Sequence, residues 1–133
     1  MVLDGIELDD QFEWTDEFDW DAVTQEQERS ITGALLVQEG TKLHGRPITL
    51  KANGGVWTPL SVVRQLEALR DQRLKVMDLV LPDGREFTVI FNRAGGAPLK
   101  ATQVFRTVNP APDEIYDVEI SLITVAPPPP ETP

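Results

Sequence analysis

The stretch that decides the fold class is Lys75-Val-Met-Asp-Leu-Val-Leu-Pro-Asp-Gly-Arg-Glu-Phe-Thr-Val-Ile-Phe91. Two apolar runs, residues 75–81 and 85–91, flank the turn sequence Pro82-Asp-Gly84. Proline sets φ early in a turn and glycine tolerates the left-handed conformation, so the two runs are predicted to fold back on each other as an antiparallel hairpin. Phe87, Val89 and Phe91 share one parity and are predicted to point to one face.

Further strands are expected on the C-terminal side of this hairpin. Residues 93–98 form a Gly-rich connector, residues 99–105 have the composition of a strand, and residues 109–112 form a Pro-rich break. The last strand alternates strictly, because Tyr116, Val118, Ile120 and Leu122 are separated by Asp117, Glu119 and Ser121. This pattern predicts one buried face and one solvent-facing face.

The N-terminal side is also strand-like from Arg29 onward. Ile31, Gly33, Leu35 and Val37 share one parity, residues 38–45 read as a loop, and residues 47–51 can form a second strand. This arrangement predicts an antiparallel hairpin between residues 31–37 and 47–51. The sequence Asn53-Gly-Gly55 is then expected to end the second strand in a turn.

One helix is predicted, over residues 59–71. Thr58 can serve as the N-cap and Pro59 suits the first helical position. The residues that follow place an apolar stripe opposite a charged and amide-bearing face; the stripe comprises Val62, Val63, Leu66 and Leu69. Such a stripe is typical of a helix that packs on a sheet.

The predicted element order is β-β-α-β-β-β-β, in a chain of 133 residues that is long enough for one core. Hairpins favour a mainly β (α+β) fold, namely a small antiparallel β-barrel or sandwich with one packed helix. We divide the chain into an extended N-terminal arm (residues 1–28), a β-rich domain (29–125) and a Pro-rich tail (126–133). The tail is expected to be disordered or an extended polyproline segment.

The excess negative charge lies in the first thirty residues. They hold eleven acids and Arg29 as the single base, whereas the other 103 residues hold eleven of each, so the net charge of −10 belongs to this segment. A chain with this distribution has no basic surface for nucleic acid and is repelled by anionic lipid. We therefore expect no direct sequence-specific nucleic-acid binding and no membrane partner.

The same segment contains four large aromatic residues within nine positions. They alternate with carboxylates, and the candidate partner-binding residues are Phe12, Trp14, Phe18 and Trp20 with Asp16, Glu17 and Asp19. Apolar rings of this size favour burial, and three arrangements would provide it. The rings can pin the segment onto the surface of their own domain, anchor it on another subunit, or belong to a disordered motif that folds on binding.

No catalytic constellation is evident in the sequence. The chain has no cysteine, and its single histidine, His44, lies in a Gly-rich loop-like context. The sequence therefore predicts no catalytic triad based on Cys or His and no zinc site. The acidic run of residues 16–21 lacks the spacing of an EF-hand loop, and the glycines of 53–55 and 94–97 lack phosphate-binding spacing. We expect a non-enzymatic protein without metal or cofactor.

Residues 6–125 resemble small structural proteins of tailed bacteriophages. The resemblance rests on five features: the opening from Glu13-Trp14 to Phe18-Asp-Trp20, residues 29–39, the phrase Gly45-Arg-Pro-Ile-Thr-Leu50, the helix, and the hairpin at Leu81-Pro-Asp-Gly-Arg85. It implies a virion tail or baseplate component, made in the host cytoplasm, whose β-rich domain assembles into rings or other multi-copy structures with tail tube, hub or neighbouring baseplate subunits. The competing interpretation is a free-standing acidic adaptor or inhibitor of a basic host protein. On either interpretation, deletion of residues 1–22 is expected to leave a folded domain that no longer associates with its partner.

Overall fold

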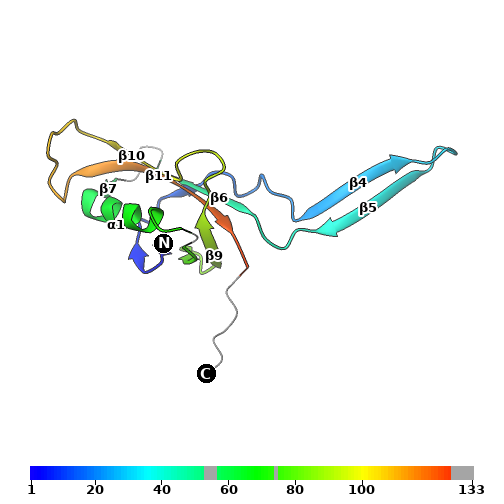
Figure 1. Ribbon diagram of the computed structural model, residues 1–133, viewed down its shortest axis with the longest axis horizontal. Coiled ribbons are helices and arrows are strands. Elements are labelled where there is room, and N and C mark those ends of the chain that lie inside the picture. The colour runs from blue at the N-terminus through cyan, green and yellow to red at the C-terminus, as the bar shows by residue number, and fades with distance from the viewer. Residues whose placement is uncertain (53–56, 74, 127–133) are drawn as a thin grey trace, which may run out of the picture.

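The molecule consists of a β-sheet body with one helix and a long hairpin that projects from it (Figure 1). The computed structural model describes residues 1–52, 57–73 and 75–126. The body contains nine strands in one antiparallel sheet: β1 (Val2–Leu3), β2 (Ile6–Glu7), β3 (Glu13–Trp14), β6 (Pro47–Lys51), β7 (Thr58–Pro59), β8 (Met77–Val80), β9 (Glu86–Phe91), β10 (Leu99–Gln103) and β11 (Ile115–Thr124). The projecting hairpin is a separate two-stranded sheet of β4 (Val23–Arg29) and β5 (Leu35–Thr41).

The main sheet is open, which excludes the barrel alternative and retains the sandwich. Its strand order is β2-β1-β8-β9-β11-β6-β3, and β10 and β7 pair with β11 beside this path. Within the part of the chain that is described, the end strands β2 and β3 do not pair with each other. The mainly β, antiparallel fold with one helix is therefore confirmed.

The hairpin predicted over residues 75–91 is confirmed. Strand β8 pairs with β9 in the register Met77↔Val89 to Val80↔Glu86. The Gly84 N–H donates to the Leu81 carbonyl at 3.0 Å, and Gly84 has φ +92°, a conformation that favours glycine.

Strand β11 organises the body because it pairs with four other strands, β6, β7, β9 and β10. Its predicted alternation is confirmed, since Tyr116, Val118, Ile120 and Leu122 are buried. They lie in one core cluster with Leu50 of β6 and residues of β8 and β9. The core thus lies on one face of the sheet, as the pattern of the sequence predicts.

The helix α1 spans Leu60–Arg70, one residue shorter at each end than predicted. It buries Leu60, Val63 and Leu66 in the core. Its start differs from the prediction, because Thr58 belongs to β7 and pairs with Tyr116, and extended Pro59 (φ −64°, ψ 149°) precedes the first helical residue with no side-chain cap. Strand pairing holds Thr58 away from the capping position.

The predicted hairpin between residues 31–37 and 47–51 is wrong. Strand β5 pairs with β4, in the register Val23↔Thr41 to Arg29↔Leu35, whereas β6 lies between β11 and β3. Residues 38–41, expected as loop, continue β5. The alternation of a strand does not specify its partner, and the polar residues 23–28 of β4 fall within the predicted acidic arm.

The N-terminal segment of residues 1–28 is not a separate arm. Its first half contributes β1, β2 and β3 to the main sheet, and Leu3, Leu8 and Phe12 are core residues. Its end falls within β4. Deletion of residues 1–22 would remove three core side chains, contrary to the expectation that the remaining chain folds without them.

Two expectations fall on residues that the structure does not describe. The turn expected at Asn53-Gly-Gly55 and the Pro-rich tail beyond Ala126 both lie outside the described ranges.

Candidate functional site: a projecting hairpin and its base

Arg46 lies at the base of the projecting hairpin, in contact with two tryptophans. Its guanidinium carbon lies 4.5 Å from the ring centroid of Trp14 and 5.6 Å from that of Trp20. Trp20 precedes β4 and Arg46 follows β5, so this contact joins the two chain segments that connect the hairpin to the body. Cation–π contacts of this kind stabilise a partly desolvated site by about 0.5–2 kcal/mol each.

Hydrogen bonds complete this base. The Arg46 guanidinium donates to the Glu17 carbonyl at 2.7 Å, and the Arg46 N–H donates to Thr124 Oγ1 at 2.9 Å. Asp16 accepts from the backbone N–H and the hydroxyl of Thr49, at 2.9 and 2.8 Å. Thus Asp16 forms hydrogen bonds at the base of the hairpin through its side chain, and Glu17 does so through its backbone carbonyl.

The aromatic residues predicted to bind a partner are divided by the structure. Phe12 is 6% exposed within the core, and the half-buried Trp14 packs edge-to-face on Phe87 with ring centroids 5.6 Å apart. Trp20 is also half-buried, with Lys42 and Arg46 over its ring. Phe18 is 90% exposed.

The acidic residues of the predicted site follow the same division. The Glu17 carboxylate accepts from Arg85 at 3.2 Å, whereas Asp19 is exposed. Three of the seven predicted residues are therefore packed against their own chain through their rings, and Asp16 and Glu17 are bonded to it. Phe18 and Asp19 remain on the surface as candidates for partner contact.

The hairpin itself is the feature that the sequence interpretation missed. All fourteen residues of β4 and β5 are exposed, and the hairpin extends away from the body (Figure 1). Its turn is well formed: the Ser30 N–H donates to the Ala34 carbonyl at 2.8 Å, and Gly33 has φ +87°. A better signal was the turn sequence Ser30-Ile-Thr-Gly33 between two extended runs of equal length.

The two faces of the hairpin differ in chemistry. Cross-strand partners share a face, and one face carries Val23, Leu35 and Val37, with Arg29 and Glu39. The opposite face carries Glu26, Glu28 and Leu36 with no base. Ile31 is fully exposed in the turn. Apolar side chains on an exposed ribbon indicate a surface that another polypeptide covers.

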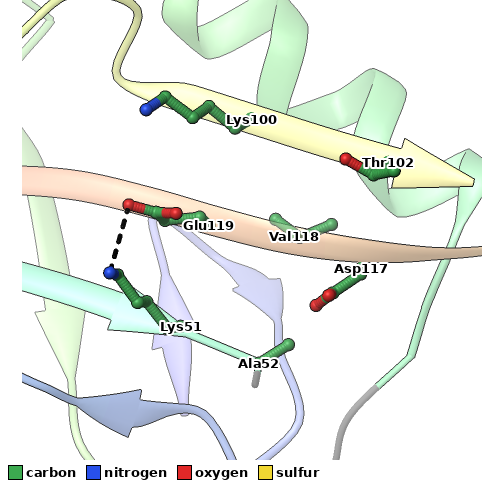
Figure 2. Close-up of a pocket in the computed structure, with 7 residues that line it drawn as sticks. All are labelled: Lys51, Ala52, Lys100, Thr102, Asp117, Val118 and Glu119. Atoms are coloured by element: carbon green, nitrogen blue, oxygen red, sulfur yellow. Dashed lines mark ion pairs between the residues drawn. The ribbon is translucent and has the colours of Figure 1, made fainter. Parts of the chain in front are cut away.

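The polar hollow beside β10 and β11 lacks the features of a small-molecule site. Figure 2 shows its lining, in which Lys51 of β6 pairs with Glu119 of β11 at 3.9 Å. Its volume of about 180 Å³ is smaller than the ~300 Å³ at which small-molecule pockets begin. Mixed charges in a shallow hollow do not define a substrate.

Metal-binding clusters and membrane-spanning helices are absent from the described ranges. Residues 1–52, 57–73 and 75–126 contain no group of three or more His, Cys, Asp or Glu side chains placed to hold a metal ion. His44 lies exposed in the loop between β5 and β6. None of the helical residues described forms a segment long and apolar enough to cross a bilayer.

Comparisons with known proteins add no assignment. No protein-family model, no curated protein and no solved structure matches the chain. The functional argument therefore rests on the hairpin, its base and the open edges of the sheet.

Proposed function

We propose that the chain is a non-enzymatic structural subunit that assembles with other subunits of a phage tail or baseplate and uses the β4–β5 hairpin to hold them. The observation that carries the proposal is the hairpin: fourteen strand residues exposed outside the body, with apolar side chains on both faces. A two-stranded ribbon of this kind is marginally stable alone, so a covering partner is the physical reason to retain it. The resemblance of residues 6–125 to tail proteins supports the virion setting.

The base of the hairpin supports an assembly role. Arg46, Trp14 and Trp20 fix the direction in which the ribbon leaves the body, and Asp16 bonded to Thr49 holds the adjoining segment on β6. A fixed exit direction lowers the conformational entropy that docking would otherwise cost. An assembly subunit needs such pre-organisation to engage its neighbours in one geometry.

The second candidate function is an acidic adaptor that binds a basic protein. The hairpin face with Glu26 and Glu28 and no base favours it, as does the net charge of −10. Electrostatic attraction alone would make this binding strongly salt-dependent. Apolar docking of Leu35 and Val37 would be much less sensitive to salt.

Excision of the hairpin tests the proposal. Residues 23–41 are replaced by Asn-Gly, which joins Ala22 and Lys42, a hydrogen-bonded pair, through a two-residue turn. Because these residues contribute nothing to the core, the shortened chain is expected to remain folded and to keep its thermal midpoint. It is expected to be lost from tail particles that incorporate the full-length chain.

Phe18→Ala provides the matched control outside the hairpin. Phe18 is exposed, so its truncation should leave the fold intact, and it tests the originally predicted aromatic site separately. Full incorporation of the hairpin-excised chain would contradict the proposal. Absence of the full-length chain from particles, together with salt-sensitive capture of a basic host protein, would favour the adaptor.

A further inference from the structure

A hollow of about 260 Å³ lies beside the base of the hairpin, where strand β11 ends. Its walls come from Trp20, the loop between β5 and β6, the first half of β9 and the end of β11. The volume is below the ~300 Å³ at which small-molecule pockets begin, so the hollow is too small to enclose a free ligand. An extended segment of polypeptide can lie across an open hollow of this size.

Several side chains of this hollow carry unpaired hydrogen-bond donors. The indole N–H of Trp20 and the ring nitrogens of His44 have no hydrogen-bond partner among the described residues. The Arg46 guanidinium donates to the Glu17 carbonyl and forms no ion pair in the same part of the chain. The single acid among the described lining residues is Glu86, at an exposed position. These donors need an acceptor from an occupant.

Apolar side chains form the rest of the walls. Leu43 is 79% exposed, and the half-buried Trp20, Phe87 and Val125 also line the hollow. Exposed apolar surface next to unpaired donors selects an occupant that has both apolar groups and hydrogen-bond acceptors.

The chain itself leaves β11 at the rim of this hollow. The Gly45 N–H donates to the Thr124 carbonyl and the Val125 N–H to the Thr88 carbonyl, both at 2.9 Å. Thr124 and Val125 line the hollow, and the sequence that follows them is Ala126-Pro-Pro-Pro-Pro-Glu-Thr-Pro133. Four residues of polyproline helix span roughly 12 Å, so residues 127–130 are within reach of Trp20 and Leu43 on the far walls.

We infer that residues 127–130 of this chain dock in the hollow, with proline rings against Leu43 and Trp20 and a carbonyl that accepts from the Trp20 indole N–H. Proline has no backbone N–H, so four consecutive prolines offer carbonyl acceptors without competing donors. Pro-rich segments bind aromatic-lined grooves because their preformed extended conformation loses little entropy on binding. This contact goes beyond the proposed assembly function and does not depend on it.

The covalent connection selects this segment over a segment of another chain. A short connection places a binding segment at millimolar effective concentration, so a contact too weak to form between separate molecules is occupied within one molecule. Val125 belongs to the wall of the hollow, and only Ala126 separates it from the first proline. The connection is therefore as short as the hollow allows.

Charge does not select the occupant. Glu131 would approach Arg46, but Glu86 lines the same hollow, and Asp19 and Asp21 flank Trp20 in the sequence. Lys42 lies 5.9 Å from the ring centroid of Trp20, and its exposed side chain can move aside. The contact is consequently expected to depend on the prolines and not on Glu131.

Replacement of the prolines tests the inference in the full chain. The four substitutions from Pro127→Ser to Pro130→Ser are combined, which keeps the length of the segment and leaves the core unchanged. Hydrogen exchange of the Trp20 indole N–H, followed by NMR, is expected to accelerate at least about fivefold, the effect of losing one hydrogen bond. The indole of Trp57, which does not line the hollow, is the internal reference. Glu131→Gln is the matched control in the same segment and should leave the exchange rate unchanged.

A second pair of variants tests the wall of the hollow. Leu43→Ser removes apolar surface at an exposed position and should accelerate exchange of the Trp20 indole N–H in the unmodified segment, but not in the chain that lacks the four prolines. Leu36→Ser, at an exposed leucine of the hairpin that does not line the hollow, should change neither rate.

Three results would overturn the inference. Unchanged exchange at Trp20 after the four proline substitutions would show that the hollow does not hold the segment. Acceleration by Glu131→Gln as large as that caused by the proline substitutions would make the contact electrostatic. Protection of Trp20 that rises with chain concentration between about 10 μM and 1 mM would mean that the hollow binds a segment of another copy, because docking within one molecule is independent of concentration.

Discussion

The body strand β11 and the hairpin strands β4 and β5 are regular antiparallel structure in two different environments. Strand β11 buries every second side chain against a helix and further strands, whereas all residues of β4 and β5 are exposed. Antiparallel pairing therefore occurs in both environments, but stability requires a second layer. The hairpin has its second layer only at its base, and the remainder is available to a partner.

The largest effect that separates the two regions should come from equivalent leucine truncations. Leu122→Ala removes a fully buried side chain of β11 and is expected to lower the free energy of unfolding by about 2–5 kcal/mol. Leu35→Ala removes a side chain that is 48% exposed and should change it by about 0.5 kcal/mol or less. Urea titrations of both variants provide the measurement, and equal shifts would show that the hairpin is packed on its own body.

An intermediate effect is expected at the junction of the two regions. Arg46→Ala removes the cation from Trp14 and Trp20 and the bond to the Glu17 carbonyl, and should lower the free energy of unfolding by about 1–3 kcal/mol. Amide exchange at Ala22 to Lys42 should accelerate more than exchange in β11. Arg64→Ala, in an exposed position of the helix, is the control and should alter neither quantity. Unchanged exchange in Arg46→Ala would mean that the hairpin does not depend on this base.

The smallest effect concerns the turn between β8 and β9. Asp83 accepts from the backbone N–H of Arg85 at 3.1 Å and from its Nε at 2.7 Å, and the backbone bond in particular holds the pKa of this carboxyl below its ordinary value of 3.8. A pKa that is lower in the folded chain stabilises the fold above pH 3.8, and this contribution disappears as the pH falls through the folded value.

Asp83→Asn should therefore reduce the loss of thermal stability between pH 7 and pH 3. The effect is small, because Asp83 is exposed and screened by solvent. Asp113→Asn removes the same charge at an exposed position whose carboxylate has no bonding partner among the described residues, so its melting curve should keep the pH dependence of the unmodified chain. Identical acid profiles for Asp83→Asn and the unmodified chain would show that the turn bonds contribute nothing measurable.

Some of these features could be predicted from residues that are close together in the sequence. The turn at Pro82-Asp-Gly84, the alternation of residues 116–122 and the apolar stripe of the helix each depend on neighbours within a few positions, and the structure confirms all three. The same local signals could not assign a partner to β5. Its apolar alternation resembles that of a body strand, and β4 is too polar to suggest a pairing strand.

The aromatic N-terminal segment shows the same limit. Its composition indicated that the rings need burial, but Phe12, Trp14 and Trp20 are covered by residues far along the chain, such as Phe87 and Arg46. The predicted partner-binding residues therefore lie largely at the base of the interaction element, and the element itself begins three residues after Trp20.

Periodicity and turn chemistry in the sequence by themselves determined that this chain is mainly β with one helix, because both act over a few residues. Only the tertiary structure decided which strands pair, which aromatic rings are covered and which hairpin stays exposed. Those outcomes depend on contacts between distant segments, such as β6 with β11 and Arg46 with Trp14, and on the exclusion of water from one common core.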